Sequence, residues 1–192
     1  MNYHNITYPD MNNGDGLRVV LWLSGCNHHC KNCQNPQTWD VNSGILFDES
    51  AKEELFRELG KDYISGITLT GGDPLHENNL DEVISLIKEI RERFPSKTIW
   101  LYTGYVVKLV EHRMVDLDYN IVCGYSFMTE NPSKNAIDNF KRASIIGGVD
   151  VVVDGEYKEE LRDVSLHWVG SSNQRVIDIK KSIEQKRVIT IE

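Results

Sequence analysis

The sequence of 192 residues lacks an apolar run long enough to cross a membrane. A spanning helix needs about 20 consecutive, mostly apolar residues, and no segment approaches that length. The first residues, Met1 to Asn5, also lack the basic and apolar stretches of a secretory signal. We therefore expect no membrane partner, and a cytoplasmic protein whose thiols stay reduced.

An excess of basic residues is also absent. The sequence has 21 Lys and Arg against 29 Asp and Glu, which gives a formal net charge of −8. Surfaces that bind nucleic acids or anionic membranes broadly carry the opposite sign. The charge balance therefore argues against a nucleic-acid partner.

Cysteine is scarce, but three of the four cysteines fall close together. Cys26, Cys30 and Cys33 have the spacing C-x3-C-x2-C. Thiolates at this spacing can hold three corners of a four-iron cluster, because thiolates are the usual ligands of iron–sulfur clusters. Three protein ligands leave one iron open, and an open position in a catalytic metal centre is where a substrate binds.

Other uses of these thiols need weighing. A structural zinc site takes four ligands, and Cys123, His28 or His29 offers a fourth. The same residues would complete a cluster ligated only by protein. Disulfides are disfavoured because they are rare in the cytosol. Simple burial is disfavoured because the segment also carries polar residues. A zinc-stabilised interaction module without catalysis therefore stays open at this point.

Strands and helices alternate along most of the chain. We expect strands at 18–23, 66–70, 98–102, 120–123 and 149–153, and helices at 48–60, 79–94 and 106–113. Such alternation implies right-handed crossovers and a mainly parallel sheet. A complete eight-unit barrel takes about 250 residues, which is more than this chain has. The sequence therefore predicts an α/β fold, an open partial (β/α) barrel with a curved sheet, in a single domain spanning 1–192.

Several segments carry weaker signals. Residues 1–16 are polar and turn-rich and suggest an approach loop or a short edge strand. Ser50 and Glu53 have the spacing of a capping box. The polar segment from about 126 to 148 interrupts the rhythm and suggests an insertion with a short helix at 136–143. The segments 176–179 and 187–191 are strand-like.

The sequence Gly71-Gly72-Asp73-Pro74 directly follows the expected strand at 66–70. Two glycines let a backbone approach a ligand closely, although the same residues are also common in plain turns. Cys26, Thr103 and Asp154 also fall just past expected strand ends. Ligands of parallel α/β folds bind at this edge of the sheet, so we expect the site there.

The three-cysteine motif together with Gly71-Gly72-Asp73 resembles the radical S-adenosylmethionine superfamily. The resemblance implies that Cys26, Cys30 and Cys33 hold a 4Fe-4S cluster whose open iron is chelated by the methionine part of S-adenosylmethionine. One electron from the reduced cluster then cleaves this cofactor to methionine and a 5′-deoxyadenosyl radical.

Further matches, in family order over nearly the whole chain, resemble the activating proteins of anaerobic ribonucleoside-triphosphate reductase. They are Asn13 to Gly16, Gly25-Cys26, Trp39, Val41 to Gly44, Gly71 to His76, Thr103 to Tyr105, Val153 to Gly155 and Gly170 to Arg175. The resemblance implies an oxidoreductase that takes a hydrogen atom from a glycine of the reductase large subunit and so forms a glycyl radical. It also implies a low-potential electron donor as a partner.

The same resemblance implies the cofactor contacts. Asn32, Cys33 and Gln34 on one segment, and Gly71, Gly72 and Asp73 on another, are expected to hold S-adenosylmethionine, with Gly72 at its amino group. No general base is expected, because the cofactors carry the chemistry. Another small radical S-adenosylmethionine enzyme, or another glycyl-radical activase, remains the nearest alternative.

Three residues near these motifs have more ordinary expected roles. We expect Cys123 to be a buried thiol of an apolar strand. His28 and His29 are expected to shape the cysteine loop without touching iron.

Overall fold

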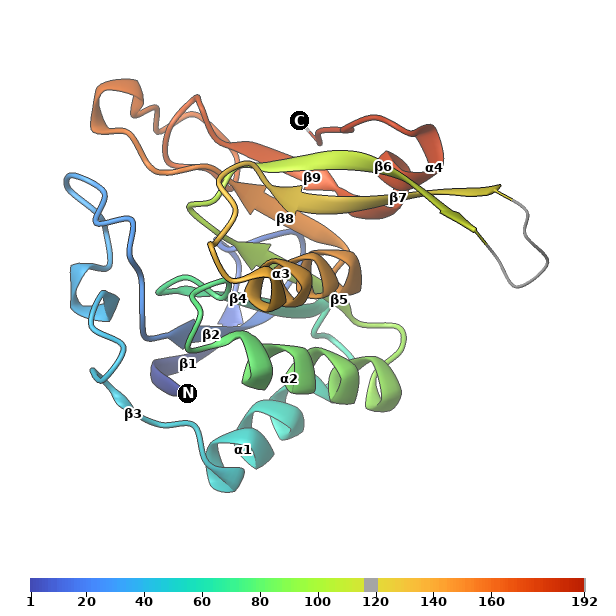
Figure 1. Cartoon of the computed structure of the whole chain (residues 1–192). Coiled ribbons are helices and arrows are strands. Elements are labelled where there is room, and N and C mark those ends of the chain that lie inside the picture. The colour runs from blue at the N-terminus through green and yellow to red at the C-terminus, as the bar shows by residue number, and fades with distance from the viewer. Residues whose placement is uncertain (116–120, 192) are drawn as a thin grey trace.

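The computed structural model describes residues 1–115 and 121–191. Its main sheet has seven strands in the order β3-β1-β2-β4-β5-β8-β9 (Figure 1). The strands are β1 (Asn2–Asp10), β2 (Arg18–Leu23), β3 (Ile45–Leu46), β4 (Gly66–Gly71), β5 (Thr98–Tyr102), β8 (Val151–Asp154) and β9 (Arg175–Asp178). Strands β2, β4, β5 and β8 run parallel, whereas β1, β3 and β9 join by antiparallel pairing. The predicted α/β class is confirmed, with a sheet that is mixed at its edges.

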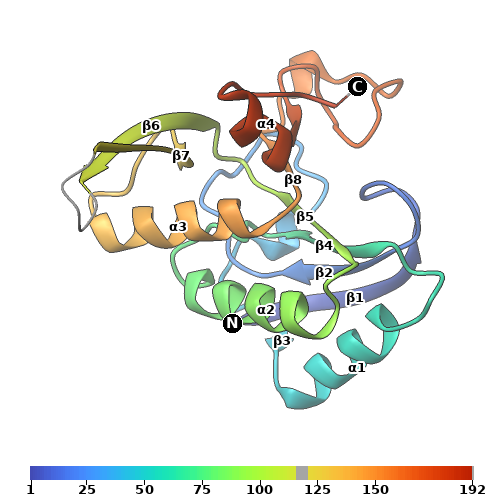
Figure 2. The ribbon, with the colours of Figure 1, turned by 90° about the vertical axis from the view of Figure 1, so that its right-hand side faces the viewer.

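Helices α1 (Glu49–Leu59), α2 (Leu80–Arg93) and α3 (Ala136–Gly148) lie on one face of this sheet (Figure 2). Alternate strand residues pack against them in one apolar core, because successive side chains of a strand point to opposite faces. This core includes Val19, Leu21, Leu23, Ile67, Leu69, Ile99, Leu101, Leu55, Val83 and Ile146. A short helix, α4 (Ile179–Gln185), follows β9.

The helix expected at 79–94 is confirmed as α2, and the one expected at 48–60 as α1. The predicted capping box of Ser50 and Glu53 is wrong. Asp48 caps α1 instead, because its side chain accepts a hydrogen bond of 3.0 Å from the backbone N–H of Ala51. The helix therefore begins at Glu49, directly after this aspartate.

The opposite face of the sheet carries the other set of alternate residues, and Arg18 lies fully buried on it. Its guanidinium donates to the Thr68 hydroxyl at 2.7 Å and to the carbonyl oxygen of Ile67 at 2.6 Å. It also lies over the Trp100 ring, 5.4 Å from the centroid. Burial lowers the pKa of Arg18 to about 10. This cation, satisfied by neutral oxygens, fills the amino-terminal end of that face.

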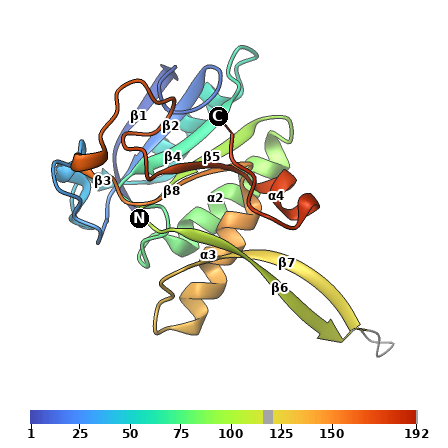
Figure 3. The ribbon, with the colours of Figure 1, turned by 90° about the horizontal axis from the view of Figure 1, so that it is seen from above.

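The helix predicted at 106–113 is wrong, because this segment forms β6 (Val107–Val115). It pairs antiparallel with β7 (Ile121–Thr129) in a separate hairpin that extends away from the main sheet (Figure 3). The strand expected at 120–123 therefore belongs to this hairpin, and position 120 lies outside the described residues. Pairing along the whole of β6 satisfies its backbone and overrides a weak local helix pattern.

The segment predicted as an insertion, 126–148, holds the end of β7 and all of α3. The helix expected at 136–143 is confirmed and continues to Gly148. It packs against β7 and α2, and Ile145 and Ile146 are buried in the core. Whether the segment is an insertion stays a prediction.

Both ends of the chain differ from expectation. Residues 2–10 form β1, which has nine residues and is not an edge strand because β3 pairs outside it, so the expected short edge strand is wrong there. Residues 11–17 form a loop, as expected for the turn-rich end of this segment. The segment 176–179 overlaps β9, but 187–191 is no strand and makes only an isolated bridge from Thr190 to Ile177. Among the described residues, no helix has both the length and the apolar character needed to cross a bilayer.

Two glycines test the packing of this sheet. At Gly66, which opens β4, a Cβ atom would lie 2.0 Å from the carbonyl oxygen of Thr98 on β5. We expect Gly66→Ala to lower the free energy of unfolding by about 1–3 kcal/mol or more, because β5 must shift. Gly147 in α3 has no atom within 4 Å of such a Cβ, so Gly147→Ala is the matched control. Urea unfolding of the reduced apoprotein measures both, and equal midpoints would contradict this prediction.

Candidate active site

The three predicted cluster ligands lie in the loop that follows β2. The loop turns tightly, because the backbone N–H of Cys33 donates to the carbonyl oxygen of Cys30 at 3.1 Å. His29 and Asn32 have φ values of 49° and 57°, in the left-handed region that residues other than glycine rarely adopt. The base of the loop is fixed, because Cys26 N–H donates to the carbonyl oxygen of Trp39 at 3.0 Å. The backbone of this loop thus forms one compact turn around the three thiols.

The thiols are half-buried, and backbone N–H groups face all three sulfurs. Burial, with the charge of Asp73, raises the pKa of Cys26 to about 12, while the N–H groups of His28 and His29 act in the opposite direction. Burial also raises the pKa of Cys30, which the N–H of Tyr157 opposes. Asn35 N–H donates to the sulfur of Cys33 at 3.3 Å. Such donors stabilise the negative sulfurs of a cluster, so this loop fits an iron–sulfur group.

A single metal ion is a different requirement. In the part of the chain that the structure describes, no three His, Cys, Asp or Glu side chains gather closely enough to hold one ion. The ligands of a four-iron cluster occupy separate corners, which suits three thiols spread around one loop. The fourth cysteine, Cys123, lies in β7, and its side chain is outside the described part, so its burial stays a prediction.

Gly71 and Gly72 bring the end of β4 directly against the cysteine loop. The N–H of Gly72 donates to the carbonyl oxygen of Leu23, and the N–H of Asp73 to that of Gly25, each at 2.7 Å. A Cβ at Gly72 would lie 2.6 Å from the oxygen of Gly25, so only glycine fits this approach. The two segments that the sequence singled out are therefore in backbone contact.

Asp73 connects the loops after three strands. Its carboxylate is 2% exposed and accepts hydrogen bonds from the Thr103 hydroxyl at 2.9 Å and the Gly104 N–H at 3.0 Å. It also lies 2.9 Å from Nε2 of His28, and it accepts from the N–H of Leu75 at 2.8 Å. The ends of β4 and β5 and the cysteine loop all meet at this side chain.

His28, between two of the cysteines, is held from two sides. Its Nδ1 lies 2.9 Å from the carboxylate of Glu156, opposite its contact with Asp73. Burial alone would lower the pKa of His28, but the two carboxylates raise it to about 9, so the ring is a cation near neutral pH. Tyr105 packs edge-on against it at 4.7 Å. Sequence reasoning expected a shaping role here but missed both partners, which are 45 and 128 residues away.

Arg142 of α3 is a site neighbour that sequence reasoning missed. It is 3% exposed, donates to the carbonyl oxygen of Leu75 at 2.9 Å and to the hydroxyl of Tyr105 at 3.0 Å. Its guanidinium also lies over the Tyr105 ring at 4.6 Å. The available signal was a lone arginine among the apolar positions of a helical segment.

A cavity of about 430 Å³ opens beside the cysteine loop. It lies on the face of the sheet that carries Arg18, here called the inner face, opposite α1, α2 and α3. Trp22, Thr70 and Tyr102, from three neighbouring parallel strands, form part of its wall. The complete lining is Asn12, Asn13, Trp22, Cys33, Gln34, Asn35, Thr70, Tyr102, Tyr157, Leu166, Trp168, Val169, Gly170 and Gln174. Of the predicted site residues, Cys33 and Gln34 line this cavity. The others do not: Cys26, Cys30, Asn32, Gly71, Gly72 and Asp73.

Hydrogen bonds hold the segment from Gly170 to Arg175, part of which lines this cavity, against the end of β8. The amide oxygen of Gln174 accepts from the N–H of Gly170 at 3.0 Å, and its nitrogen donates to the carbonyl oxygen of Gly155 at 3.0 Å. Nε of Arg175 donates at 2.9 Å to Asp154, which is 1% exposed. The motif therefore ties the C-terminal segment to the end of β8.

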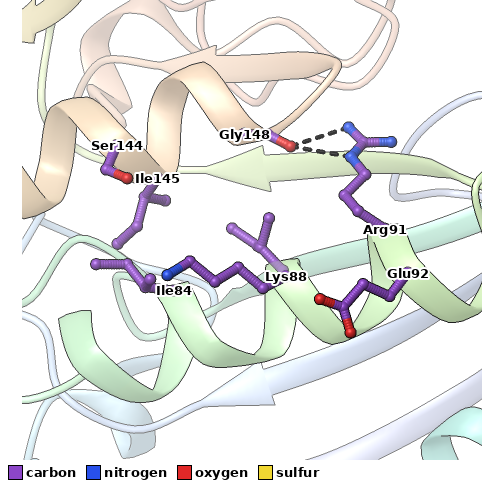
Figure 4. Close-up of a pocket in the computed structure, with 8 residues that line it drawn as sticks. Ile84, Lys88, Arg91, Glu92, Ser144, Ile145 and Gly148 are labelled. Carbon is purple, nitrogen blue, oxygen red and sulfur yellow. Dashed lines mark hydrogen bonds between the residues drawn. The ribbon is translucent and has the colours of Figure 1, made fainter.

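A second cavity, of about 330 Å³, lies between α2 and α3 (Figure 4). Its walls include Ile84, Lys88 and Ile145, and Arg91 donates to the carbonyl oxygen of Gly148 at 2.9 and 3.1 Å. None of the predicted site residues lines it. It lies between two helices that cover one face of the sheet, away from the cysteine loop.

Asp73→Asn tests whether this carboxylate holds the site together. We expect the free energy of unfolding of the reduced apoprotein to fall by about 3–5 kcal/mol, because an amide nitrogen would face bound N–H donors and His28 would lose a buried partner. Asp40→Asn, at an exposed position of the loop that follows β2, is the control and should leave urea unfolding unchanged. If Asp73→Asn unfolds like the wild type, the role of Asp73 lies in cofactor contact alone.

The chain is similar to known proteins over most of its length. Residues 12–177 match the family model described as a 4Fe-4S single cluster domain. The anaerobic ribonucleoside-triphosphate reductase-activating protein of Enterobacteria phage T4 is 38% identical over 176 residues, covering 92% of this chain and 93% of the relative. That of Escherichia coli (strain K12) is 36% identical over 178 residues, covering 92% and 97%. That of Haemophilus influenzae is 34% identical over 176 residues, covering 91% and 96%.

These matches favour the iron–sulfur alternative over the zinc module, and the three cysteines agree with three-thiolate ligation of one cluster. The chain belongs to the family of anaerobic ribonucleoside-triphosphate reductase-activating proteins, which are radical S-adenosylmethionine enzymes with a 4Fe-4S cluster.

Proposed function

We propose that this protein forms a glycyl radical in the large subunit of anaerobic ribonucleoside-triphosphate reductase, with S-adenosylmethionine bound at a cluster held by Cys26, Cys30 and Cys33. One observation carries the proposal: three thiols that backbone N–H groups face lie on a loop in direct contact with the Gly71-Gly72-Asp73 segment. The ligands of the cluster and the expected cofactor segment thus form a single site.

When bound, the reduced cluster supplies one electron that splits S-adenosylmethionine into methionine and a 5′-deoxyadenosyl radical, which takes the hydrogen atom from the glycine Cα. The residues of the chain bind and orient the cluster and S-adenosylmethionine. Asn32, Gln34, Gly71, Gly72 and Asp73 are proposed to hold S-adenosylmethionine, and Gln34 reaches the cavity.

The contacts divide the work among these residues. The N–H of Gly72 is bonded to Leu23, so its carbonyl oxygen is the group left to accept from the amino group of the cofactor. The carboxylate of Asp73 is engaged by Thr103, Gly104, His28 and Leu75, so it acts by positioning the loops. Cys33 and Gln34 line the cavity, where they contact S-adenosylmethionine from the side of the cluster.

We further propose that the seven-stranded sheet is the expected open partial (β/α) barrel. The arc of its strands in Figure 3 supports this reading. Arg18 and Trp100 fill the amino-terminal end of the inner face, while the cavity lies at the carboxyl ends of β2, β4 and β5. Substrate therefore enters from the carboxyl edge, as in other parallel α/β folds.

The partners follow from the reaction. The large subunit of the reductase is the protein substrate, and a low-potential electron donor reduces the cluster. The net charge of −8 argues against a nucleic acid as a further partner.

The cysteines provide the first test of the cluster. Replacing Cys26, Cys30 or Cys33 with alanine should lower the iron content after anaerobic reconstitution and abolish glycyl-radical formation, because each removes a ligand. Cys123→Ala is the control and should keep the cluster. In the reduced wild-type protein, the electron paramagnetic resonance signal of the cluster should change when S-adenosylmethionine is added.

The radical itself tests the function. The wild-type protein mixed anaerobically with the reductase, S-adenosylmethionine and a reductant should give a glycyl-radical signal. No signal with active components would contradict the proposal. A cluster that does not respond to S-adenosylmethionine would argue for a closed cluster, and zinc without a cluster would restore the interaction module.

A further inference from the structure

The loop that follows β8 touches the cysteine loop at two points. This loop, here called the β8 loop, comprises Gly155 to Lys158 and directly follows the last residue of the strand. The carboxylate of Glu156 lies 2.9 Å from Nδ1 of His28. The backbone N–H of the next residue, Tyr157, faces the sulfur of Cys30. The β8 loop therefore reaches both an expected cluster ligand and the histidine two residues before it.

The segment from Gly170 to Arg175 holds the β8 loop from its other side. The side-chain nitrogen of Asn173 donates to the carbonyl oxygen of Glu156 at 2.8 Å. The N–H of Lys158 donates to the hydroxyl of Ser171 at 3.1 Å. These hydrogen bonds restrict the backbone of the β8 loop, so its contacts with the cysteine loop occur at a defined position.

His28 is a fixed side chain between the two loops. A Cβ atom at Gly104 would lie 2.5 Å from its ring, so the ring packs directly on the glycine backbone. Tyr105 packs edge-on against the ring at 4.7 Å, and Asp73 lies 2.9 Å from its Nε2. These neighbours leave Nδ1 as the nitrogen that faces the β8 loop, and Glu156 pairs with it.

A hydrogen bond to a ligating sulfur changes the properties of an iron–sulfur cluster. The reduced cluster carries one more negative charge, which is shared with its sulfurs, so an N–H donor stabilises the reduced form more than the oxidised form. Such a donor therefore raises the reduction potential. Groups that bond to metal ligands also retain the metal, and their removal typically costs about 10–100-fold in metal affinity.

We propose that Glu156 is a positioning residue of the cluster: through His28 it holds the β8 loop against the cysteine loop, with the N–H of Tyr157 on the sulfur of Cys30. This contact raises the reduction potential of the cluster and slows the loss of iron. The inference rests on the proposed function, because it takes Cys30 as a cluster ligand. The side chain of Glu156 is 52% exposed, so its replacement does not open the core.

Two substitutions separate this contact from the charge of Glu156. Glu156→Gln keeps an oxygen that can accept from Nδ1 of His28, whereas Glu156→Ala does not. Both remove a negative charge, and this loss alone would raise the potential. The expected difference is therefore between the two variants: Glu156→Ala should have the lower midpoint potential and should release iron to a chelator about tenfold faster than Glu156→Gln.

The potential is measured on the reconstituted protein without S-adenosylmethionine, by reductive titration followed by electron paramagnetic resonance. Glu160→Ala removes an exposed carboxylate four residues further along the chain and is the control, which should match the wild type in both measurements. Equal values of either quantity in Glu156→Ala and Glu156→Gln would overturn the inference.

His28→Gln tests whether Glu156 acts through His28. A Gln side chain keeps a donor near the position of Nε2, so Asp73 stays paired, but it loses the contact with Glu156. In this background, Glu156→Ala and Glu156→Gln should have the same potential, because the contact that separates them is already absent. A difference that persists would overturn the inference. A wild-type protein that takes up no iron–sulfur cluster would instead overturn the proposed function, and the inference with it.

Discussion

The site depends on one buried carboxylate. Asp73 accepts hydrogen bonds from the loop after β5 and from its own loop, and it pairs with His28 inside the cysteine loop. A carboxylate without water keeps its charge only when donors surround it, so these loops hold Asp73 as firmly as it holds them. The buried charge of Asp73 and its hydrogen bonds therefore fix the position of the cysteine loop relative to the strand ends.

The two faces of the sheet have different roles: one packs in the apolar core, and the other carries residues of the cavity. The face toward the helices is an apolar core in which Leu21, Leu69 and Leu101 are fully buried. The other face carries Arg18 and Trp100, and the cavity residues Trp22 and Tyr102. Strand alternation separates these two sets by a single residue. A shift of one position in pairing would turn the cavity residues into the core, so the register of β2 and β4 protects the site.

Local patterns were enough to predict much of this from sequence. The apolar spacing of α2 and the short apolar runs of β2, β4 and β5 depend on neighbours in the chain, and their interpretation was confirmed. The hairpin of β6 and β7 was misread because its strands are defined by pairing with each other. The partners of His28 were missed for the same reason, since Asp73 and Glu156 come from distant loops. The cysteines were found because their spacing itself carries the chemistry.

The cysteine loop is anchored at both of its ends. Ser24, where it begins, donates its N–H to the carbonyl oxygen of Asn2 at 3.0 Å, and Phe47, just past its end, donates to that of Met1 at 3.1 Å. Asn2 is the first residue of β1 and Met1 directly precedes it, so much of the entropy of closing this loop is lost when the sheet forms. Insertion of the cluster then has little conformational ordering left to oppose it, in contrast to small zinc domains that fold only around their metal. Maturation of this protein is accordingly a loading step on a folded scaffold, and a chelator that strips the iron should leave the scaffold standing.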